Sequence, residues 1–329
     1  MNPKPKESGT LQRWWTVRVL ARAIFLKQRL QRAASCYVTC PGNQDGLGAQ
    51  LQCRLSGMLF AECQGLRYAH SPFTAFDFTS ANNPDWPAKW ERFLGIGAGE
   101  PLAADVAREL GEPRRVINPT QIRKIGNTFW SVPGCHEYAD LYPHQYLRLT
   151  GRFATRYAAA PKDGCVPHYT SGAVNVAIHL RRGGDLSHKL HLRSDDSFTA
   201  MLLKNLLSAF PGSGKNVILR VFSQGETKDF PALLPFGVEF HLNEDLFATL
   251  HSLIKADVLV MAKSSLSYSA ALLSQGVKIY TPPWWHQPLP GWLVAGKNGS
   301  LDYEQLTRAL RSTQNVETTH IASEAERHL

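Results

Sequence analysis

The sequence of 329 residues lacks any uninterrupted apolar run of about 18 residues, the length that a membrane-spanning helix needs. It is also poor in cysteine: the six cysteines, at positions 36, 40, 53, 63, 135 and 165, form no C-x-x-C pair and show no metal-ligand spacing. At this density in a long chain, we expect reduced and mostly buried thiols, as in a cytosolic protein. The 43% hydrophobic and 19% charged residues fit a soluble globular protein with one large or two ordinary domains.

Most of the chain has almost no excess of positive over negative charge, although the formal net charge is +9. Residues 1–32 hold eight of the 36 lysines and arginines and one of the 27 acidic residues, which leaves 28 basic against 26 acidic residues elsewhere. A body this close to neutral argues against a basic surface for nucleic acid.

The basic N-terminal segment also contains bulky apolar residues such as Trp14, Trp15 and Phe25. Arg18 and Arg22 interrupt its apolar run, which argues against a signal peptide or a spanning anchor. One interpretation is a basic helix, over residues 12–32, that lies on an anionic membrane surface. The other is an ordinary amphipathic helix docked on the body. The expected location is cytoplasmic, peripheral to a membrane under the first interpretation, with the Golgi or another secretory lumen as the alternative.

The pattern of apolar runs predicts an α/β fold with two Rossmann-like domains and a nucleotide cleft between them. After residue 166, buried-strand patterns alternate with helical patterns through short loops, which is typical of a doubly wound parallel sheet. The expected parts are the basic segment 1–34, an N-terminal α/β domain 35–165, a C-terminal Rossmann-like domain 166–312 and a disordered tail 313–329. Expected strands cover 36–40, 173–180, 216–223, 238–242, 257–264 and 277–282, with helices over 197–210, 244–256 and 266–276, a helix or loop over 227–234, and no clear assignment for most of 71–135.

Ligands of such sheets bind beyond the carboxyl ends of the strands, so residues that follow strands carry the most information. The loop "DGLGAQL" follows the first expected strand, and Gly46 and Gly48 in it allow a sharp turn and close approach of a ligand. The helix that begins there would favour an anion. The spacing matches neither a P-loop nor a dinucleotide fingerprint.

A second such place is "HLRRGGD", His179 to Asp185, at the end of a buried strand. Arginine presents a planar fork of donors suited to phosphate oxygens. Because alternate side chains of a strand face opposite ways, only one of Arg181 and Arg182 is expected to face the ligand. The other is expected to pair with a structural carboxylate, for which Asp185 is a candidate.

A third place is the strand-to-helix turn with Ser264, Ser265 and Ser267, whose hydroxyls and free backbone N–H groups could surround an anion. Simple N-capping explains only one of these serines. Ser223 is a polar residue at the end of another expected strand, where it could contact a base or a ribose. No convincing D-x-D metal pair is present, so we expect no bound metal, with arginine and helix N-termini neutralising a diphosphate instead.

The G-x-G-x-Q loop, the H-x-R-R…D strand end and the late "AD-x-LV…SS-x-S" turn together resemble the α1,2/α1,6/O-fucosyltransferase superfamily. The resemblance covers residues 43–65 and most of the chain after residue 166. It implies two Rossmann-like domains in the GT-B arrangement, an acceptor-side N-terminal domain, and inverting transfer of fucose from GDP-fucose to a glycan hydroxyl without a metal or other cofactor.

The resemblance also implies roles for single residues. Gly46 and Gly48 match the glycine loop that faces the nucleotide sugar, and His179 matches a position beside the guanine. Arg181 matches the arginine that contacts the β-phosphate, and Ser265 matches the serine at the diphosphate. The remaining matches are Arg182 for the second arginine and Asp185 for the acid that closes the motif, displaced by one extra glycine.

One position departs from the family pattern: Thr249 stands where an acidic residue often reads the guanine edge. Glu244, Asp245, His251 or Ser223 could take its place, and a different nucleotide sugar is the alternative donor. The alternative to an enzyme is a non-catalytic carbohydrate-binding protein with a degenerate nucleotide site. Candidates for a general base are Asp185, His188, His191 and Asp195. Trp86, Trp90, Trp130 and the "TPPWWHQPLPGW" segment could stack on sugars, although core packing is the commoner role of tryptophan.

Overall fold

The computed structural model describes residues 36–42, 45–76, 83–124, 126–182, 192–210 and 216–311. The expected basic segment and C-terminal tail therefore lie outside the described residues. No helix of the part that is described has the length and hydropathy to cross a membrane. The six cysteines are free, and four of them are buried, as expected.

The N-terminal half folds around a four-stranded parallel sheet in the order β2-β1-β4-β3. Strand β1 and helix α2 were expected from the sequence, whereas the strands within residues 71–135 were not. The elements are β1 (Cys36–Thr39), α2 (Leu47–Gln64), β2 (Arg67–Tyr68), α3 (Trp86–Leu94), α4 (Ala103–Leu110), β3 (Arg114–Arg115), the 3-10 turn η1 (Pro119–Gln121), β4 (Thr128–Ser131), α5 (His136–Leu141) and α6 (Pro143–Ala159).

The C-terminal half folds around a six-stranded parallel sheet in the order β10-β9-β8-β5-β6-β7. Every expected strand and helix of this half is present, and the short strand β10 is an addition. The elements are β5 (Val174–His179), α7 (Asp196–Leu207), β6 (Val217–Ser223), the 3-10 turns η3 (Thr227–Asp229) and η4 (Pro231–Phe236), β7 (Glu239–Leu242), α8 (Leu246–Lys255), β8 (Val258–Val260), α9 (Ser265–Leu273), β9 (Val277–Tyr280) and β10 (Leu293–Val294). Residues 303–311 are also helical.

Strand β5 lies in the middle of the C-terminal sheet, and all six of its residues are buried. Its side chains divide between two cores. Val174, Val176 and Ile178 pack with α7, whereas Ala177 belongs to the cluster that contains α8 and α9. This division is the physical reason why the strand reads as a continuous apolar run.

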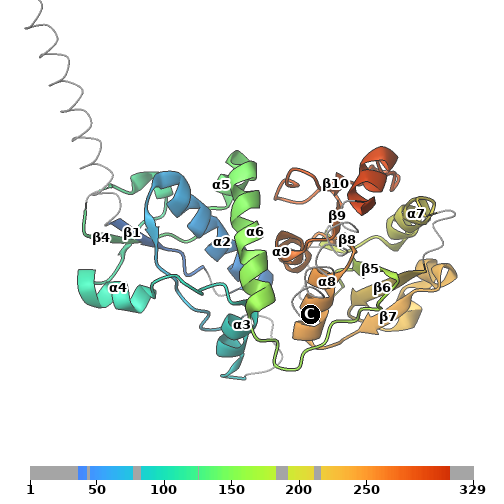
Figure 1. The fold of residues 1–329 in the computed structure, drawn as a ribbon, viewed down its shortest axis with the longest axis horizontal. Coiled ribbons are helices and arrows are strands. Elements are labelled where there is room, and N and C mark those ends of the chain that lie inside the picture. Colours follow the sequence, from blue (N-terminus) through green and yellow to red (C-terminus); the bar gives the residue numbers. More distant parts are fainter. Residues whose placement is uncertain are drawn as a thin grey trace, which may run out of the picture.

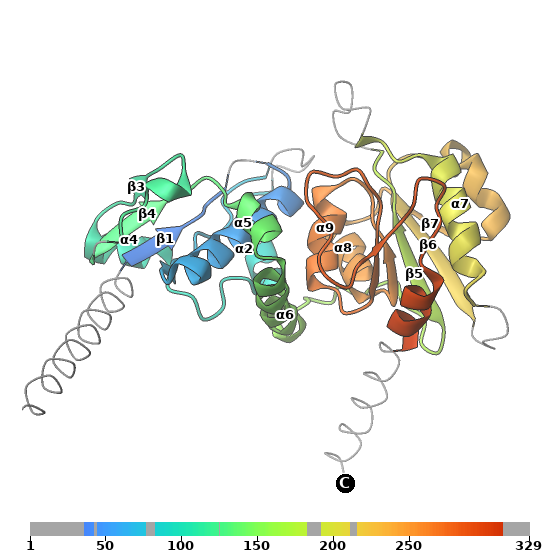
Figure 2. The ribbon, with the colours of Figure 1, turned by 90° about the horizontal axis from the view of Figure 1, so that it is seen from above.

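The two halves lie side by side, with α2, α5 and α6 of the N-terminal half facing α8 and α9 of the C-terminal half (Figures 1 and 2). The chain crosses between them once in the described residues, through the segment 160–173 that follows α6. One hydrophobic core continues across the junction and includes Phe93 and Tyr157 from one side with Leu250 and Tyr268 from the other. The structure is therefore an α/β fold with two parallel-sheet units, as the sequence predicts.

Candidate functional site

The C-terminal sheet reverses its strand order between β5 and β8. From β5 the chain moves outward to β6 and β7, and then it returns to the other side of β5 with β8 and β9. Loops after β5 and β8 therefore diverge, and the crevice between them is where open α/β sheets bind ligands.

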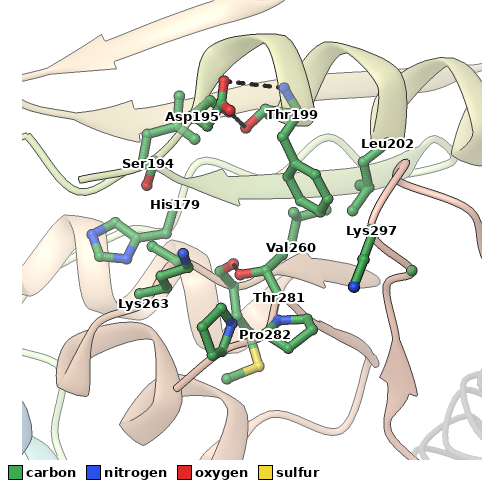
Figure 3. A pocket seen from close by; sticks show the side chains of 16 residues that line it. His179, Ser194, Asp195, Thr199, Leu202, Val260, Lys263, Thr281, Pro282 and Lys297 are labelled. Atoms are coloured by element: carbon green, nitrogen blue, oxygen red, sulfur yellow. Dashed lines mark hydrogen bonds between the residues drawn. The ribbon is translucent and has the colours of Figure 1, made fainter. Parts of the chain in front are cut away.

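A cavity of about 510 Å³ lies at this point. Its wall contains His179 and Leu180 at the end of β5, and Met261 to Lys263 after β8, as Figure 3 shows in part. The remaining lining residues come from α7 and the two residues before it, from the end of β8, and from the segments after β9 and β10: Ser194, Asp195, Phe198, Thr199, Leu202, Val260, Thr281, Pro282, Pro283, Gly296 and Lys297. All of these residues belong to the C-terminal half.

The two arginines after β5 point to opposite faces of the sheet, as the alternation of strand side chains predicts. Arg182 lies over the ring of Phe230, with 5.2 Å between the guanidinium carbon and the ring centroid. It forms an ion pair with Asp196 and donates a hydrogen bond to the carbonyl oxygen of Ser194. Its carboxylate partner is thus Asp196, at the start of α7, and the expected candidate Asp185 lies outside the described residues.

Arg181 extends toward α9 and the N-terminal half. Its Nη1 donates to the carbonyl oxygen of Lys263 at 3.4 Å, and its backbone N–H donates to Ser194 Oγ at 2.8 Å. Burial lowers the pKa of Arg181, and the nearby carboxylate of Asp45 in the N-terminal half opposes this shift. Among the described residues, the carbonyl oxygen of Lys263 is the one hydrogen-bond acceptor of this guanidinium.

Helices α2 and α9 pack against each other with their N-termini at the same end. Gly48 lies against the backbone of Ser265, and one turn later Gln52 lies beside Ser269. Ser269 Oγ donates to the carbonyl oxygen of Gly48 at 2.9 Å, and Gln52 Nε2 donates to that of Ser265 at 2.9 Å. The expected ligand loop of the N-terminal half is thereby brought to the serine turn of the C-terminal half.

The two glycines of that loop differ in their surroundings. A Cβ built on Gly48 would lie 2.4 Å from the carbonyl carbon of Ser265, so this glycine permits the close approach of two helices. A Cβ on Gly46 would meet nothing within 4 Å. Gly46 is also the N-cap of α2 and offers no side-chain hydrogen bond, so the first N–H groups of the helix have no side-chain cap. Gly46 is therefore the glycine with open space beside it, and Gly48 is held by packing.

The three serines of the β8–α9 turn also divide. Ser264 caps α9 by accepting the N–H of Leu266 at 3.3 Å. Ser267 Oγ, which is fully buried, donates to the carbonyl oxygen of Ala262 and accepts its N–H, and it thereby closes the turn. In the described part of the chain, the hydroxyl of Ser265 has no hydrogen-bond partner. Ser265 is thus the one of the three whose side chain remains available to a ligand.

His179 is 8% exposed, and it lines the cavity beside Lys263 (Figure 3). Burial, together with the charge of Arg181, lowers the pKa of His179 to about 4, so the ring is neutral at pH 7. Its Nδ1 atom is buried and has no hydrogen-bond partner among the described residues. Because the ring is neutral and its Nδ1 lacks a partner among the described residues, His179 is suited to a hydrogen bond with an uncharged polar group of a ligand.

Residues expected to meet a base are mostly engaged elsewhere. Ser223 Oγ donates to the carbonyl oxygen of Leu180 at 2.8 Å, and Asp245 caps α8 by accepting two backbone N–H groups. His251 forms a hydrogen bond with Tyr157 of α6. Thr249 is half-buried on α8. The cavity itself offers Thr199, Lys263, Thr281 and Lys297, none of which the sequence singled out as a site residue, although each lies near the end of a strand or the start of a helix.

Glu244 accepts hydrogen bonds from two histidines, His168 Nε2 at 2.7 Å and His241 Nδ1 at 2.8 Å. Partial burial acts to raise the pKa of Glu244, but the hydrogen bonds from His241 and His168 outweigh it, and the net shift is downward. This carboxylate is therefore ionised and already partnered.

The expected general bases are not brought into the site by the described residues. Asp185, His188 and His191 lie outside them. Asp195 is described, but its carboxylate caps α7 by accepting the N–H groups of Ser197 and Phe198. Its backbone position at the cavity wall is compatible with a ligand contact, whereas its cap is a structural role.

The tryptophans serve mainly in packing. Trp90 is fully buried and stacks on Phe247 of the C-terminal half, with 3.6 Å between ring centroids and 9° between ring planes. Trp130 is buried in the N-terminal half, and Trp86 packs edge-on against Phe247. In the "TPPWWHQPLPGW" segment, Trp285 is 49% exposed, while Trp292 is buried.

A second cavity, of about 940 Å³, lies in the N-terminal half. Glu91, His70 and Arg156 are among its lining residues. His70 Nε2 lies 2.9 Å from Glu91 Oε2, and Glu91 Oε1 also accepts the N–H of Phe73 at 2.7 Å. Arg156 pairs with Glu100 at 2.9 Å. The wall of this cavity is therefore mostly apolar, and it holds a few charged side chains in fixed positions.

Comparison with known proteins gave structural likenesses alone: no protein-family model matches the chain, and no curated protein sequence matches it. Similar solved structures include POFUT1 in complex with GDP, at 12% identity over 74% of this chain and 96% of that one, with a TM-score of 0.37. Fucosyltransferase NodZ from Bradyrhizobium is similar at 14% identity over 72% and 93%, also with a TM-score of 0.37. E. coli heptosyltransferase WaaC with ADP is similar at 13% identity over 86% and 99%, with a TM-score of 0.37. At these identities the likeness concerns the arrangement of elements alone.

Proposed function

We propose that this protein is a glycosyltransferase that holds the diphosphate of a nucleotide sugar between the N-termini of α2 and α9, beside Arg181. The observation that carries the proposal is the meeting of these two helix N-termini at one guanidinium. Two parallel helices place their positive ends side by side, each equivalent to about half an elementary charge. Together with Arg181, the two helix N-termini form a site that would bind a diphosphate.

The charges around this point favour an anion in spite of one acidic neighbour. Asp45 lies near Arg181, but its carboxylate also accepts the N–H of Gly46 at 2.7 Å. The side chain of Lys263 adds a second cation at the cavity wall. Ser265 adds a hydroxyl at the start of α9 that has no hydrogen-bond partner among the described residues. A ligand with two phosphates can satisfy these donors simultaneously, which a single carboxylate cannot.

The cavity at the switch point has the size and lining for the nucleoside part. Its volume of about 510 Å³ lies within the range of roughly 300–1,000 Å³ that is typical of small-molecule sites. Phe198, Val260 and Pro282 provide apolar wall, and His179 provides a neutral polar group. The glycan acceptor would approach from the N-terminal half, where the second cavity lies.

In the proposed reaction, an acceptor hydroxyl attacks the anomeric carbon in line, and the nucleoside diphosphate leaves with inversion. Arg181 and the first N–H groups of α9 stabilise the negative charge that develops on the leaving diphosphate, which is the larger catalytic contribution in such sites. No metal or other cofactor has a part in this scheme. Base assistance would come from Asp185, His188 or His191, or the step proceeds with little of it.

The finer proposal is that the donor is GDP-fucose, which rests on the motif resemblance given above. A different nucleotide sugar is the second candidate. Thr249 favours it, because the position that often carries a base-reading acid lacks a carboxylate, and Glu244 is held by two histidines.

The test is calorimetric titration of the full chain with GDP, UDP and ADP in the presence of EDTA, followed by a donor screen with hydrolysis as readout. We expect binding of a nucleoside diphosphate with EDTA present, tightest for GDP, and a reduction of turnover by roughly 100-fold or more in Arg181→Ala. Tightest binding of UDP or ADP would replace the fucosyl proposal by the second candidate. Near-normal turnover in a folded Arg181→Ala variant, or no binding of any of the three nucleotides, would refute the site.

A further inference from the structure

His168, His241 and Glu244 form a cluster at the edge of the C-terminal sheet, and none of the three lines the cavity at the switch point. His168 comes from the segment that connects the two halves, His241 from β7, and Glu244 from the turn between β7 and α8. One ligand atom of each, two ring nitrogens and a carboxylate oxygen, all lie within 4.8 Å of one another. Two imidazoles and one carboxylate form a set that Zn²⁺ commonly takes in proteins.

The hydrogen bonds of the cluster already aim the required atoms at one point. His168 Nε2 lies 2.7 Å from Glu244 Oε2, and His241 Nδ1 lies 2.8 Å from Glu244 Oε1. The two imidazole rings lie close, with 3.9 Å between centroids, and Phe222 stacks on His241 at 5.0 Å and lies 6.0 Å from His168. The rings are therefore held in place by packing as well as by the carboxylate, which reduces the cost of ordering a metal site.

One atom of the cluster remains without a partner in the ion-free arrangement. His241 Nε2 is buried and has no hydrogen bond among the described residues, although Glu239 Oε2 lies 3.9 Å away. When Nδ1 carries the ring proton and donates to Glu244, Nε2 is a buried acceptor with no donor. A cation at Nδ1 would move the proton to Nε2, where Glu239 could accept it after a small approach. A ligating histidine that donates its other N–H to a carboxylate is a common outer-shell arrangement.

The surrounding charge also tolerates a divalent cation. With neutral imidazoles, Glu244 and Glu239 bring two negative charges. Arg220 brings one positive charge, which is paired with Glu239 at 2.7 Å. Its Nη1 also donates to the carbonyl oxygen of His168 at 3.4 Å, so it supports the backbone of one ligand.

We propose that a divalent transition-metal ion of the Zn²⁺ class binds between His168 Nε2, His241 Nδ1 and the carboxylate of Glu244, with Glu239 accepting the other ring N–H of His241. In the bound state each ring carries its proton on the nitrogen opposite the ion. Because His168 belongs to the segment 160–173, the ion fastens the connection between the two halves to the sheet edge. Its role is structural, and it has no part in the proposed transfer reaction.

The test begins with full-length protein stripped by EDTA and then dialysed into chelator-free buffer. Titration with Co²⁺ is followed by visible d–d absorption, and titration with Zn²⁺ by calorimetry. We expect about one equivalent of ion in the wild type and a rise in the melting temperature with Zn²⁺. His241→Ala and Glu244→Gln should each weaken binding by at least about 100-fold, and Glu239→Gln by about tenfold.

His144→Ala is the matched control, because His144 is an exposed histidine on α6 outside the cluster. It should leave ion binding unchanged. If His241→Ala fails to fold, the near-isosteric Glu244→Gln carries the test alone. Equal ion uptake by the wild type and Glu244→Gln, or no uptake by the wild type, would overturn the proposal. So would a Glu244→Gln variant that loses nucleotide affinity while its ion uptake is unchanged, since the carboxylate would then belong to the donor site.

Discussion

Gly48 of α2 lies against the backbone of Ser265 of α9, so closely that a Cβ on this glycine would come within 2.4 Å of the Ser265 carbonyl carbon. The contact joins the two halves at the point where both helices begin. It also holds the first N–H groups of both helices near Arg181. Those of α2 have no side-chain cap, and among those of α9 the N–H of Leu266 is capped by Ser264. The geometry of the proposed diphosphate site therefore depends on the absence of one methyl group.

The first prediction concerns this glycine. Gly48→Ala should destabilise the protein by roughly 1–3 kcal/mol, because the added Cβ meets backbone atoms that cannot move without separating the helices. Nucleotide affinity should fall as well. Gly151→Ala is the control: this glycine lies in the interior of α6 with nothing within 4 Å, and the same substitution should stabilise by about 0.5–1 kcal/mol. Urea unfolding and nucleotide calorimetry measure both effects, and equal stability of the two variants would contradict the packing argument.

The second prediction separates the adjacent arginines. Arg182→Ala should lower the free energy of unfolding by about 3 kcal/mol, because Arg182 is 7% exposed and its loss leaves Asp196 without its ion-pair partner. Arg181→Ala should change stability by less than about 1 kcal/mol, since the half-buried side chain donates to one carbonyl among the described residues, and it should instead weaken nucleotide binding. Thermal unfolding and calorimetry on both variants decide the matter. The opposite pattern would show that the roles are exchanged.

The third prediction is a loss of stability in mild acid. Burial lowers the pKa of His251 to about 4, with Lys255 and Lys162 contributing in the same direction. Because the unfolded chain binds this proton near pH 6.5 and the folded chain only near pH 4, stability falls as the pH is lowered through that window. His179 should act in the same direction.

The measurement is urea unfolding at several pH values between about 4 and 7. His251→Gln removes one titrating group, so the slope of its free energy of unfolding against pH should be shallower than that of the wild type by up to about 1.4 kcal/mol per pH unit. An unchanged slope in His251→Gln would mean that the pKa of this histidine is the same in the folded and the unfolded chain.

The fourth prediction concerns the stacked pair Trp90 and Phe247, which connects α3 to α8 across the two halves. A double-mutant cycle with Trp90→Leu and Phe247→Leu should give a coupling energy of about 0.5–1.5 kcal/mol. Since the core continues across the junction, unfolding of the wild type should occur in one transition. Independent transitions for the two halves, or additive effects of the two substitutions, would refute a shared core.

Much of the C-terminal half could be predicted because its signals are local. The apolar run of β5 and the alternation of strand and helix patterns after residue 166 each depend on a few neighbouring residues. Even the opposite directions of Arg181 and Arg182 follow from the two-residue period of a strand. The strands β2, β3 and β4 escaped prediction because they are short and are stabilised by pairing with distant segments rather than by a pattern of their own.

The α/β alternation, the parallel sheet of the C-terminal half and the residue types that follow each strand could thus be inferred from the order of residues. How those residues are used depends on the folded chain, because hydrogen-bond partners and steric contacts come from segments far apart in the sequence. The tertiary structure assigned Gly48 to packing, Ser264 and Ser267 to the turn, and Asp196 to Arg182. It also joined His168 to His241 and Glu244, a cluster assembled from three segments that no spacing in the sequence connects.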